Sequence, residues 1–153
     1  ALGMPTPLPL AWATRRGAGF LRSESLLVTE AVESEALTHW LQRDLPAVAL
    51  RARVLAAYGS LAAMFHRHGY SNRDLKHENV LCARQAPWEL QVVDLDGVRH
   101  LRLISRRRAG RDLRRVGKSL AALGWAGAEE QRAFFTAYNA AVPRRLQRRA
   151  FPL

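Results

Sequence analysis

The sequence is poor in lysine, in cysteine and in long apolar segments. Only two of its 24 basic residues are lysine, Lys76 and Lys118, and Cys82 is its single cysteine. A single cysteine cannot form an internal disulfide, which suits a reducing compartment. No apolar run approaches the ~18 residues of a membrane-spanning helix, and the first residues lack the basic and apolar regions of a secretion signal. These absences exclude a disulfide-stapled scaffold and argue against a helical membrane protein.

Arginine accounts for nearly all of the positive charge. The 153 residues carry a formal net charge of +11, and a content of 48% hydrophobic and 24% charged residues fits one ordinary globular domain. Such a charge attracts nucleic acid, an anionic membrane or an acidic substrate. An arginine-rich background composition would explain it equally well, so the charge alone does not identify a partner.

The apolar pattern predicts an α+β domain that is mainly helical. Two short strands are expected near residues 10–14 and 25–32, joined by a turn at residues 17–19. A short helix at residues 35–42 follows, with Ser34 as its N-cap. These elements form the N-terminal part of the expected fold.

The rest of the chain is expected to be helical around one hairpin. Apolar residues recur at helical spacing over residues 47–68, after Pro46, and Gly69 ends that helix. The remaining predicted elements are strands at residues 80–82 and 90–93, which form a hairpin, helices at 112–123 and 128–141, and a frayed or surface tail at 143–153.

A polar, aperiodic loop lies between the long helix and the hairpin, and an aspartate follows the hairpin. Phosphoryl transfer needs a group that orients the nucleophile and oxygen atoms that hold magnesium against the phosphates. Asp74 and Asn79 in the loop supply such oxygens, as does Asp94 after the second strand, and the hairpin could bring them together. Lys76 could neutralise charge on the phosphate in transfer. Asp96 is either a second metal contact or a cap of the loop after the strand.

These segments resemble those of a known enzyme family. Residues 73–81 resemble the protein-kinase catalytic loop, which reads Arg-Asp-Leu-Lys-x-x-Asn followed by two apolar residues. Residues 64–70 resemble the segment before that loop. Residues 92–96 resemble the metal-binding Asp-Phe-Gly segment, and their Asp-Leu-Asp form is closer to the lipopolysaccharide kinases. Weaker similarity to that family covers residues 8–12, 26–30, 111–113 and 132–138.

The chain thus resembles the Kdo and heptose kinases of the lipopolysaccharide core, with a protein-kinase-like fold. Residues 1–33 would be the last N-lobe strands and the hinge, and residues 34–153 the C-lobe. The resemblance implies ATP and Mg²⁺ as cofactors and an acidic lipopolysaccharide-core sugar as acceptor. It also implies a cytoplasmic enzyme, peripheral at the inner membrane with its anionic surface. No nucleic acid partner is expected.

The resemblance also assigns roles to single residues. Asp74 would be the base that accepts the proton of the sugar hydroxyl, and Lys76 would contact the transferred phosphate. Asn79 and Asp94 would bind magnesium. The nucleotide would be held by three more positions: the backbone of Glu30 and Val32 against the adenine edge, and Leu81 beneath the adenine ring.

The sequence departs from the family at its N-terminal side. A kinase N-lobe carries a Gly-rich phosphate loop, a strand Lys and a helix Glu, and no lysine precedes Lys76 here. Asn72 replaces the usual His before Arg-Asp, a tolerable change. A fragment of a longer protein, a mispredicted gene start or a degenerate relative would each explain the missing groups. The fragment is favoured because the C-lobe residues are all in place, and this chain alone is expected to transfer phosphate poorly or not at all.

Other functions remain open at this stage. A kinase-fold enzyme could act on protein or on a small molecule such as an aminoglycoside, although Asn-Arg-Asp differs from the usual His-Gly-Asp and no Ala-Pro-Glu occurs. The chain could also be an inactive pseudokinase or a basic binding module. Structural roles are expected for Asp112 and for His66, His68 and His77. Residues 106–108, three consecutive arginines, are either a solvated run or a holder of an acidic sugar.

Overall fold

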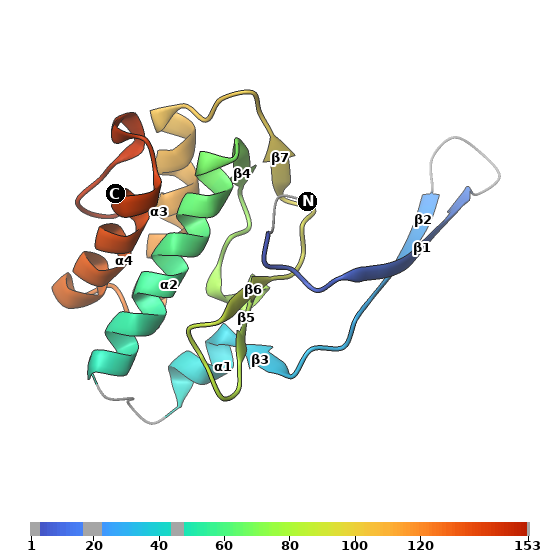
Figure 1. Cartoon of the computed structure of the whole chain (residues 1–153), viewed down its shortest axis with the longest axis horizontal. Coiled ribbons are helices and arrows are strands. Elements are labelled where there is room, and N and C mark those ends of the chain that lie inside the picture. Colours follow the sequence, from blue (N-terminus) through green and yellow to red (C-terminus); the bar gives the residue numbers. More distant parts are fainter. Residues whose placement is uncertain (1–3, 17–22, 44–47, 153) are drawn as a thin grey trace.

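The computed structural model describes residues 4–16, 23–43 and 48–152. It has a body of three long helices beside small antiparallel sheets, and a two-stranded ribbon that projects from this body (Figure 1). In chain order the elements are β1 (Pro9–Arg16), β2 (Ser23–Thr29), β3 (Ser34–Ala36), α1 (Leu37–Gln42), α2 (Val48–Arg67), β4 (Tyr70–Asn72), the 3₁₀ turn η1 (His77–Asn79), β5 (Val80–Ala83), β6 (Leu90–Val92), β7 (Val98–His100), α3 (Arg106–Ala122), α4 (Ala128–Ala141) and the 3₁₀ turn η2 (Arg144–Leu146). This is the mainly helical α+β class that the sequence predicts.

The predicted hairpin is confirmed. β5 and β6 pair antiparallel, with Val80 opposite Val92 and Cys82 opposite Leu90. These four side chains are buried in the core. β3 adds to the other edge of β5 and makes a three-stranded sheet. The hairpin therefore rests on the helical body and carries the polar loops at its ends.

A second strand pair was not predicted. β4 follows Gly69, whose φ of 81° is the left-handed conformation that ends α2. β4 pairs antiparallel with β7, so that Ser71 lies opposite Arg99 and Asn72 opposite Val98. This pair joins the segment that leads into the polar loop to the segment that follows Asp94.

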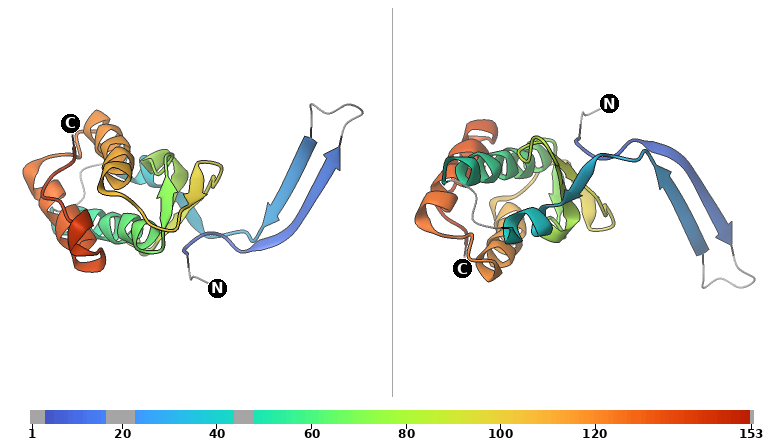
Figure 2. Two further views of the ribbon diagram at one scale, coloured as in Figure 1. Left: turned by 90° about the horizontal axis from the view of Figure 1, so that it is seen from above. Right: turned by 90° about the horizontal axis from the view of Figure 1, so that it is seen from below.

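The core forms where α2 packs against α4, which lie side by side in Figures 1 and 2. Tyr58 and Phe65 of α2 and Phe134 and Tyr138 of α4 are at most 2% exposed. Gly59 permits the close approach, because a Cβ atom there would lie 3.0 Å from the carbonyl carbon and 3.2 Å from the Cα of Phe134. The two helix backbones touch at this point.

Two expectations about element ends are wrong. Ser34 lies in β3, and the N-cap of α1 is Ala36, which makes no side-chain cap bond. α3 begins at Arg106, ahead of the expected 112, because the Ser105 hydroxyl caps it by accepting from the Arg108 N–H at 3.2 Å. Arginines in a first turn oppose the helix dipole, so a helix start is not expected among them.

The C-terminal tail is ordered against the body rather than frayed. Leu146 is fully buried, and the side chain of Asn139 bonds the backbone of Arg148 at both N–H and carbonyl, at 2.9 and 2.6 Å. The ring of Phe151 packs on Phe134 and Phe135. The expected turn at 17–19 and the helix start at Pro46 lie outside the described residues.

The β1–β2 ribbon carries exposed apolar side chains on both of its faces. Trp12 lies opposite Leu27, and the neighbouring pair of Ala11 and Val28 points to the other face. Six large apolar side chains of this region are 43–72% exposed: Leu8, Leu10, Trp12, Leu26, Leu27 and Val28. An isolated two-stranded ribbon is marginally stable in water. Among the described helices, none is both long and apolar enough to cross a membrane.

The contact at Gly59 gives a stability prediction. Gly59→Ala should lower the free energy of unfolding by ~1–3 kcal/mol, because the added methyl group forces the α2 and α4 backbones apart. This loss outweighs the ~1 kcal/mol that alanine gains in helix propensity. Urea unfolding followed by circular dichroism measures it. Ser60→Ala, at the exposed neighbouring position, is the control and should not destabilise the protein. Equal stability of the two variants would contradict the close contact.

Candidate active site

The polar loop is organised around the backbone of Asp74. Its N–H donates to Oδ1 of Asn72 at 2.9 Å, and Asn72 is 1% exposed. Its carbonyl accepts from the N–H of Lys76 at 2.8 Å and from Nδ2 of Asn79 at 2.9 Å. The residue that replaces the usual histidine thus supports the loop directly. These bonds leave the Asp74 carboxylate half-buried at the surface of the loop.

A buried tyrosine fixes the same loop from below. The hydroxyl of Tyr58 on α2 donates to the carbonyl of Leu75 at 3.0 Å, and both residues are at most 2% exposed. Burial, with a smaller contribution from Glu78, raises the pKa of Tyr58 far above its usual value, so its hydroxyl keeps its proton. The loop is therefore anchored to the core helix at the residue between Asp74 and Lys76.

The segment that contains Asp94 is clamped to this loop on both sides. The N–H of Val93 donates to the carbonyl of Asn79 at 3.0 Å, and the N–H of Arg73 donates to the carbonyl of Gly97 at 3.3 Å. Asp94 itself has a φ of 58°, an uncommon conformation that aspartate tolerates better than most residues. The structure thus holds the segment that contains Asp94 beside the loop of Asp74 and Asn79, with Asp94 exposed.

Gly97 forms a wall against the Asp74 carboxylate. A Cβ atom at Gly97 would lie 3.0 Å from both Cβ and Cγ of Asp74 and closer still to its Oδ2. Oδ2 also accepts from Nε of Arg73 at 3.1 Å. The need for glycine at this position cannot be read from the sequence, because the contact joins residues 23 positions apart.

The oxygens at the site fit magnesium. Asn79 uses its amide nitrogen in the bond to Asp74, so its Oδ1 is the atom left for a metal. The exposed carboxylate of Asp94 supplies a second oxygen, and its Oδ1 also accepts weakly from the N–H of Asp96 at 3.4 Å. No cluster of three or more His, Cys, Asp or Glu side chains suited to a metal occurs in residues 4–16, 23–43 and 48–152. Magnesium usually takes few protein ligands and completes its shell with phosphate and water.

Two of the three residues expected at the nucleotide lie together. Val32 and Leu81 line one cavity of about 390 Å³, beside β3, β5 and β6. Glu30 is not among the residues that line it. The N–H of Glu30 donates to the carbonyl of Leu8, and the carbonyl of Val32 accepts from Ser34, each at 2.9 Å. Within the described hydrogen bonds, the Glu30 carbonyl and the Val32 N–H have no protein partner.

Buried polar groups support the site from the side of α3 and α4. Asp112 is 3% exposed and accepts from the hydroxyl of Ser71 at 2.6 Å. Nε2 of His66 lies 3.4 Å from the same carboxylate oxygen, and its Nδ1 bonds the hydroxyl of Tyr138 at 2.8 Å. Burial also raises the pKa of Tyr138. The structural roles expected for Asp112 and His66 agree with these contacts.

His77 is buried in the loop itself. Its Nδ1 bonds the hydroxyl of Thr38 at 2.7 Å. Burial lowers its pKa, which Glu78 partly opposes, so the neutral ring is favoured. His77 therefore joins the loop to α1 as a structural residue.

The comparisons with known proteins agree with this architecture. The chain belongs to the lipopolysaccharide kinase (Kdo/WaaP) family, whose sequence profile matches residues 1–138. Its structure is similar to that of WaaP, solved in complex with acyl carrier protein, with a TM-score of 0.74 and 22% sequence identity. This likeness shows a shared protein-kinase-like fold. It covers 91% of this chain and 61% of the WaaP chain. A search of curated protein sequences found no match.

The reactivity of the Cys82 thiol tests the packing of the β5–β6 hairpin beneath the site. Burial raises the pKa of its thiol to about 11, and the side chain is fully buried. At pH 8 iodoacetamide should therefore label the native chain at least ~100-fold more slowly than the urea-unfolded chain, because the thiolate is the reactive form. Mass spectrometry follows the labelling, and the single cysteine makes it unambiguous. Equal rates in the two states would contradict a buried β5.

Proposed function

We propose that this chain is the hinge and C-lobe part of an ATP-dependent kinase that phosphorylates a hydroxyl group of an acidic lipopolysaccharide-core sugar. The observation that carries the proposal is the pair of backbone hydrogen bonds, Val93 to Asn79 and Arg73 to Gly97, that hold the Asp94 segment against the Asp74 loop. Membership of the lipopolysaccharide kinase family supports the chemistry and the acceptor class.

Asp74 is the proposed base. Its carboxylate is fixed between the guanidinium of Arg73 and the backbone of Gly97, and it is still partly open to solvent. From this position it would orient the acceptor hydroxyl and accept its proton. Lys76, two residues further on, forms no ion pair within the described residues, so its ammonium group is available to the phosphate in transfer.

Asn79 and Asp94 are the proposed metal ligands. These two residues would hold a magnesium ion, whose charge would offset the negative charge that develops on the phosphates during transfer. Asn79 presents its Oδ1 because its nitrogen is held by Asp74. Asp96, exposed and two residues after Asp94, is proposed as the residue that steadies the Asp94 carboxylate through its N–H.

The nucleotide base is proposed to lie along the hinge. The Glu30 carbonyl and the Val32 N–H are one acceptor and one donor left open by the described hydrogen bonds, which suits the edge of an adenine. Leu81 shares a cavity with Val32 and offers an apolar surface beneath the ring.

The chain is proposed to need an N-lobe that these residues do not supply. No Gly-rich loop with a strand lysine precedes the site, since Lys76 is the first lysine of the chain. The β1–β2 ribbon exposes apolar side chains on both faces, as we would expect for strands of a sheet whose other strands are missing. We place the boundary as the sequence suggests, with residues 1–33 as last N-lobe strands and hinge and residues 34–153 as C-lobe. A peripheral position at the cytoplasmic face of the inner membrane would suit the net charge of +11.

Kinase assays test this function. The 153-residue chain should transfer little or no phosphate from ATP to a lipid A–Kdo–heptose acceptor, and a form extended by the in-frame sequence upstream of Ala1 should transfer it. In the active form Asp74→Asn should lower kcat by ~10²–10⁴, and Asp94→Asn should raise the magnesium concentration needed for half-maximal rate.

The control for these variants is Arg132→Gln, an exposed position of α4, which should keep the full rate. Transfer that is unaffected by both aspartate variants would place the chemistry elsewhere. Robust transfer by the 153 residues alone would contradict the need for further N-lobe groups.

Gly97 provides a separate test of how Asp74 is positioned. In the active form Gly97→Ala should lower kcat by ~10² because the methyl group displaces the Asp74 carboxylate, and misplacement by ~1 Å has effects of this size. The affinity for ATP should not change. Gly127→Ala, where the added atom meets only the flexible end of Glu130, is the matched control. A normal kcat in Gly97→Ala would show that the wall against Asp74 is not needed.

A further inference from the structure

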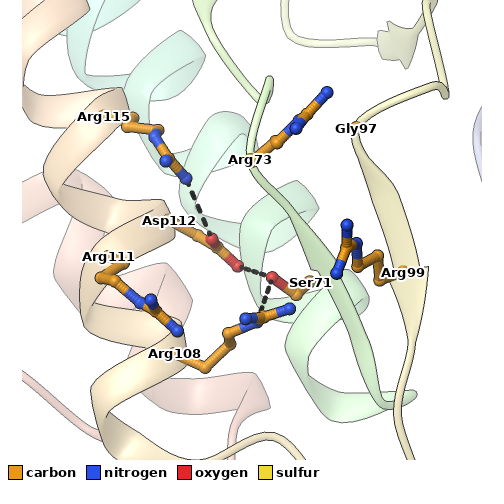
Figure 3. Close-up of a pocket in the computed structure, with 8 residues that line it drawn as sticks. All are labelled: Ser71, Arg73, Gly97, Arg99, Arg108, Arg111, Asp112 and Arg115. Atoms are coloured by element: carbon orange, nitrogen blue, oxygen red, sulfur yellow. Dashed lines mark hydrogen bonds and ion pairs between the residues drawn. The ribbon is translucent and has the colours of Figure 1, made fainter.

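A small pocket rich in arginine lies beside the proposed base (Figure 3). It has a volume of about 120 Å³, and its lining residues come from β4, the loop, the Asp94 segment, β7 and α3: Ser71, Arg73, Gly97, Arg99, Arg108, Arg111, Asp112 and Arg115. We call it the arginine pocket. It is far below the 300–1,000 Å³ of a typical small-molecule site, so it suits one charged group rather than a whole ligand.

The charge of the pocket is not balanced from within. Five arginines and one carboxylate, that of Asp112, line it, and of the five only Arg73 is paired, among the residues that the structure describes, with a carboxylate outside the pocket, that of Asp74. Within the described residues, Arg99 and Arg111 form neither an ion pair nor a side-chain hydrogen bond. Arg115 lies 3.8 Å from Asp112, a loose contact. Positive groups gathered without partners favour an incoming anion.

The single carboxylate is committed to the protein. Oδ2 of Asp112 accepts from Ser71 at 2.6 Å, and this carboxylate is 3% exposed. Ser71 in turn accepts from Nε of Arg108 at 3.2 Å. The dashed bonds in Figure 3 show this chain from Arg115 through Asp112 and Ser71 to Arg108. Asp112 therefore fixes the floor of the pocket and orients Arg108.

The chemistry of arginine indicates what would bind. Its planar guanidinium donates two parallel hydrogen bonds to a carboxylate or a phosphate, which lysine cannot do. Every cationic side chain of the pocket is arginine. An oxyanion is thus the matching ligand group.

The pocket also shares a wall with the proposed base. Gly97 lines the pocket and lies against the Asp74 carboxylate, and Arg73 both lines the pocket and donates to Asp74 at 3.1 Å. A group bound in the pocket is thereby held next to the atom that would accept a proton. The metal ligands Asn79 and Asp94 do not line it.

We propose that the arginine pocket binds an oxyanion of the sugar acceptor, a phosphate or a carboxylate, and so positions the neighbouring hydroxyl group at Asp74. This proposal rests on the proposed kinase function and names the feature of the acceptor that the site recognises. Arg99 and Arg111 are the principal donors because they have no described partner.

Binding measurements on the whole chain test the proposal without catalysis. In isothermal titration calorimetry at low salt, glucose 6-phosphate or glucuronate should bind with saturation, whereas neutral glucose should not. Whichever charged sugar binds identifies the oxyanion as phosphate or carboxylate. Inorganic phosphate should compete with it. Binding of neither charged sugar, or equal binding of glucose, would overturn the proposal.

Two double variants distinguish binding in the arginine pocket from attraction by the overall positive charge. Arg99→Gln with Arg111→Gln should weaken binding of the charged sugar by at least ~10-fold, through the loss of charge-assisted hydrogen bonds. Arg107→Gln with Arg114→Gln removes the same charge from exposed positions of α3 outside the pocket and should change binding less than ~2-fold, a change typical of long-range surface charge. Equal weakening by both pairs would mean that only the overall charge matters. Urea unfolding checks that each variant is folded.

Two further measurements separate this proposal from the kinase function. Asp74→Asn should bind the charged sugar at least as tightly as the unaltered chain, because it removes a negative charge beside the pocket, even where it abolishes transfer. Competition between Mg–ADP and the charged sugar would assign the pocket to the nucleotide and overturn the acceptor role. Independent binding of the two supports it.

Discussion

One run of backbone pairing holds the site together. It joins residues 69–83 to residues 89–101: Leu101 to Gly69, then β7 to β4, then Arg73 to Gly97, and on the other side Val93 to Asn79 and β6 to β5. The pairing is interrupted once, between Gly97 and Val93. The residues in this interval include Asp74, Lys76, Asp94 and Asp96. These charged side chains thus lie in a gap between two paired stretches of backbone, and the pairing on each side fixes the ends of the gap.

The same backbone pairing helps to bring the arginines of the arginine pocket together. Like charges repel, so five guanidinium groups around one small pocket lower stability, and other interactions of the fold must offset this cost. Here α3 supplies Arg108, Arg111 and Arg115 at helical spacing, and the β4–β7 pair brings Arg99 across from Ser71. Asp112 ties the two parts together from a buried position. Arg99 and Arg111 have no carboxylate partner among the described residues. Arg51, by contrast, is paired with Glu130 at 2.6 Å.

Much of the fold could be predicted from the sequence, for physical reasons that differ by element. α4 and the β5–β6 hairpin have regular apolar periods, and Gly69 marks the end of α2. β4 and β7 could not be predicted, because Ser71 and Asn72 are polar yet buried and Arg99 and His100 are exposed, so neither strand alternates. In the site, the spacing of Asp74, Asn79 and Asp94 is visible along the chain. The arginine pocket is not, because its residues come from separate segments and because Arg108 and Arg111 lie ahead of the expected helix start at residue 112.

The two sides of the proposed site differ in how completely they are built. The acceptor side rests on α2, α3 and α4, where Tyr58 and Asp112 hold the loop and the pocket from the core. The nucleotide side has a hinge with open backbone groups and a ribbon whose apolar residues face water on both sides. The bonds between Asp112 and Ser71 and between Ser71 and Arg108 form within the described chain and involve no nucleotide. On the proposed function, recognition of the acceptor is therefore separable from transfer of phosphate, because the residues proposed to bind the acceptor lie on the body and not on the ribbon.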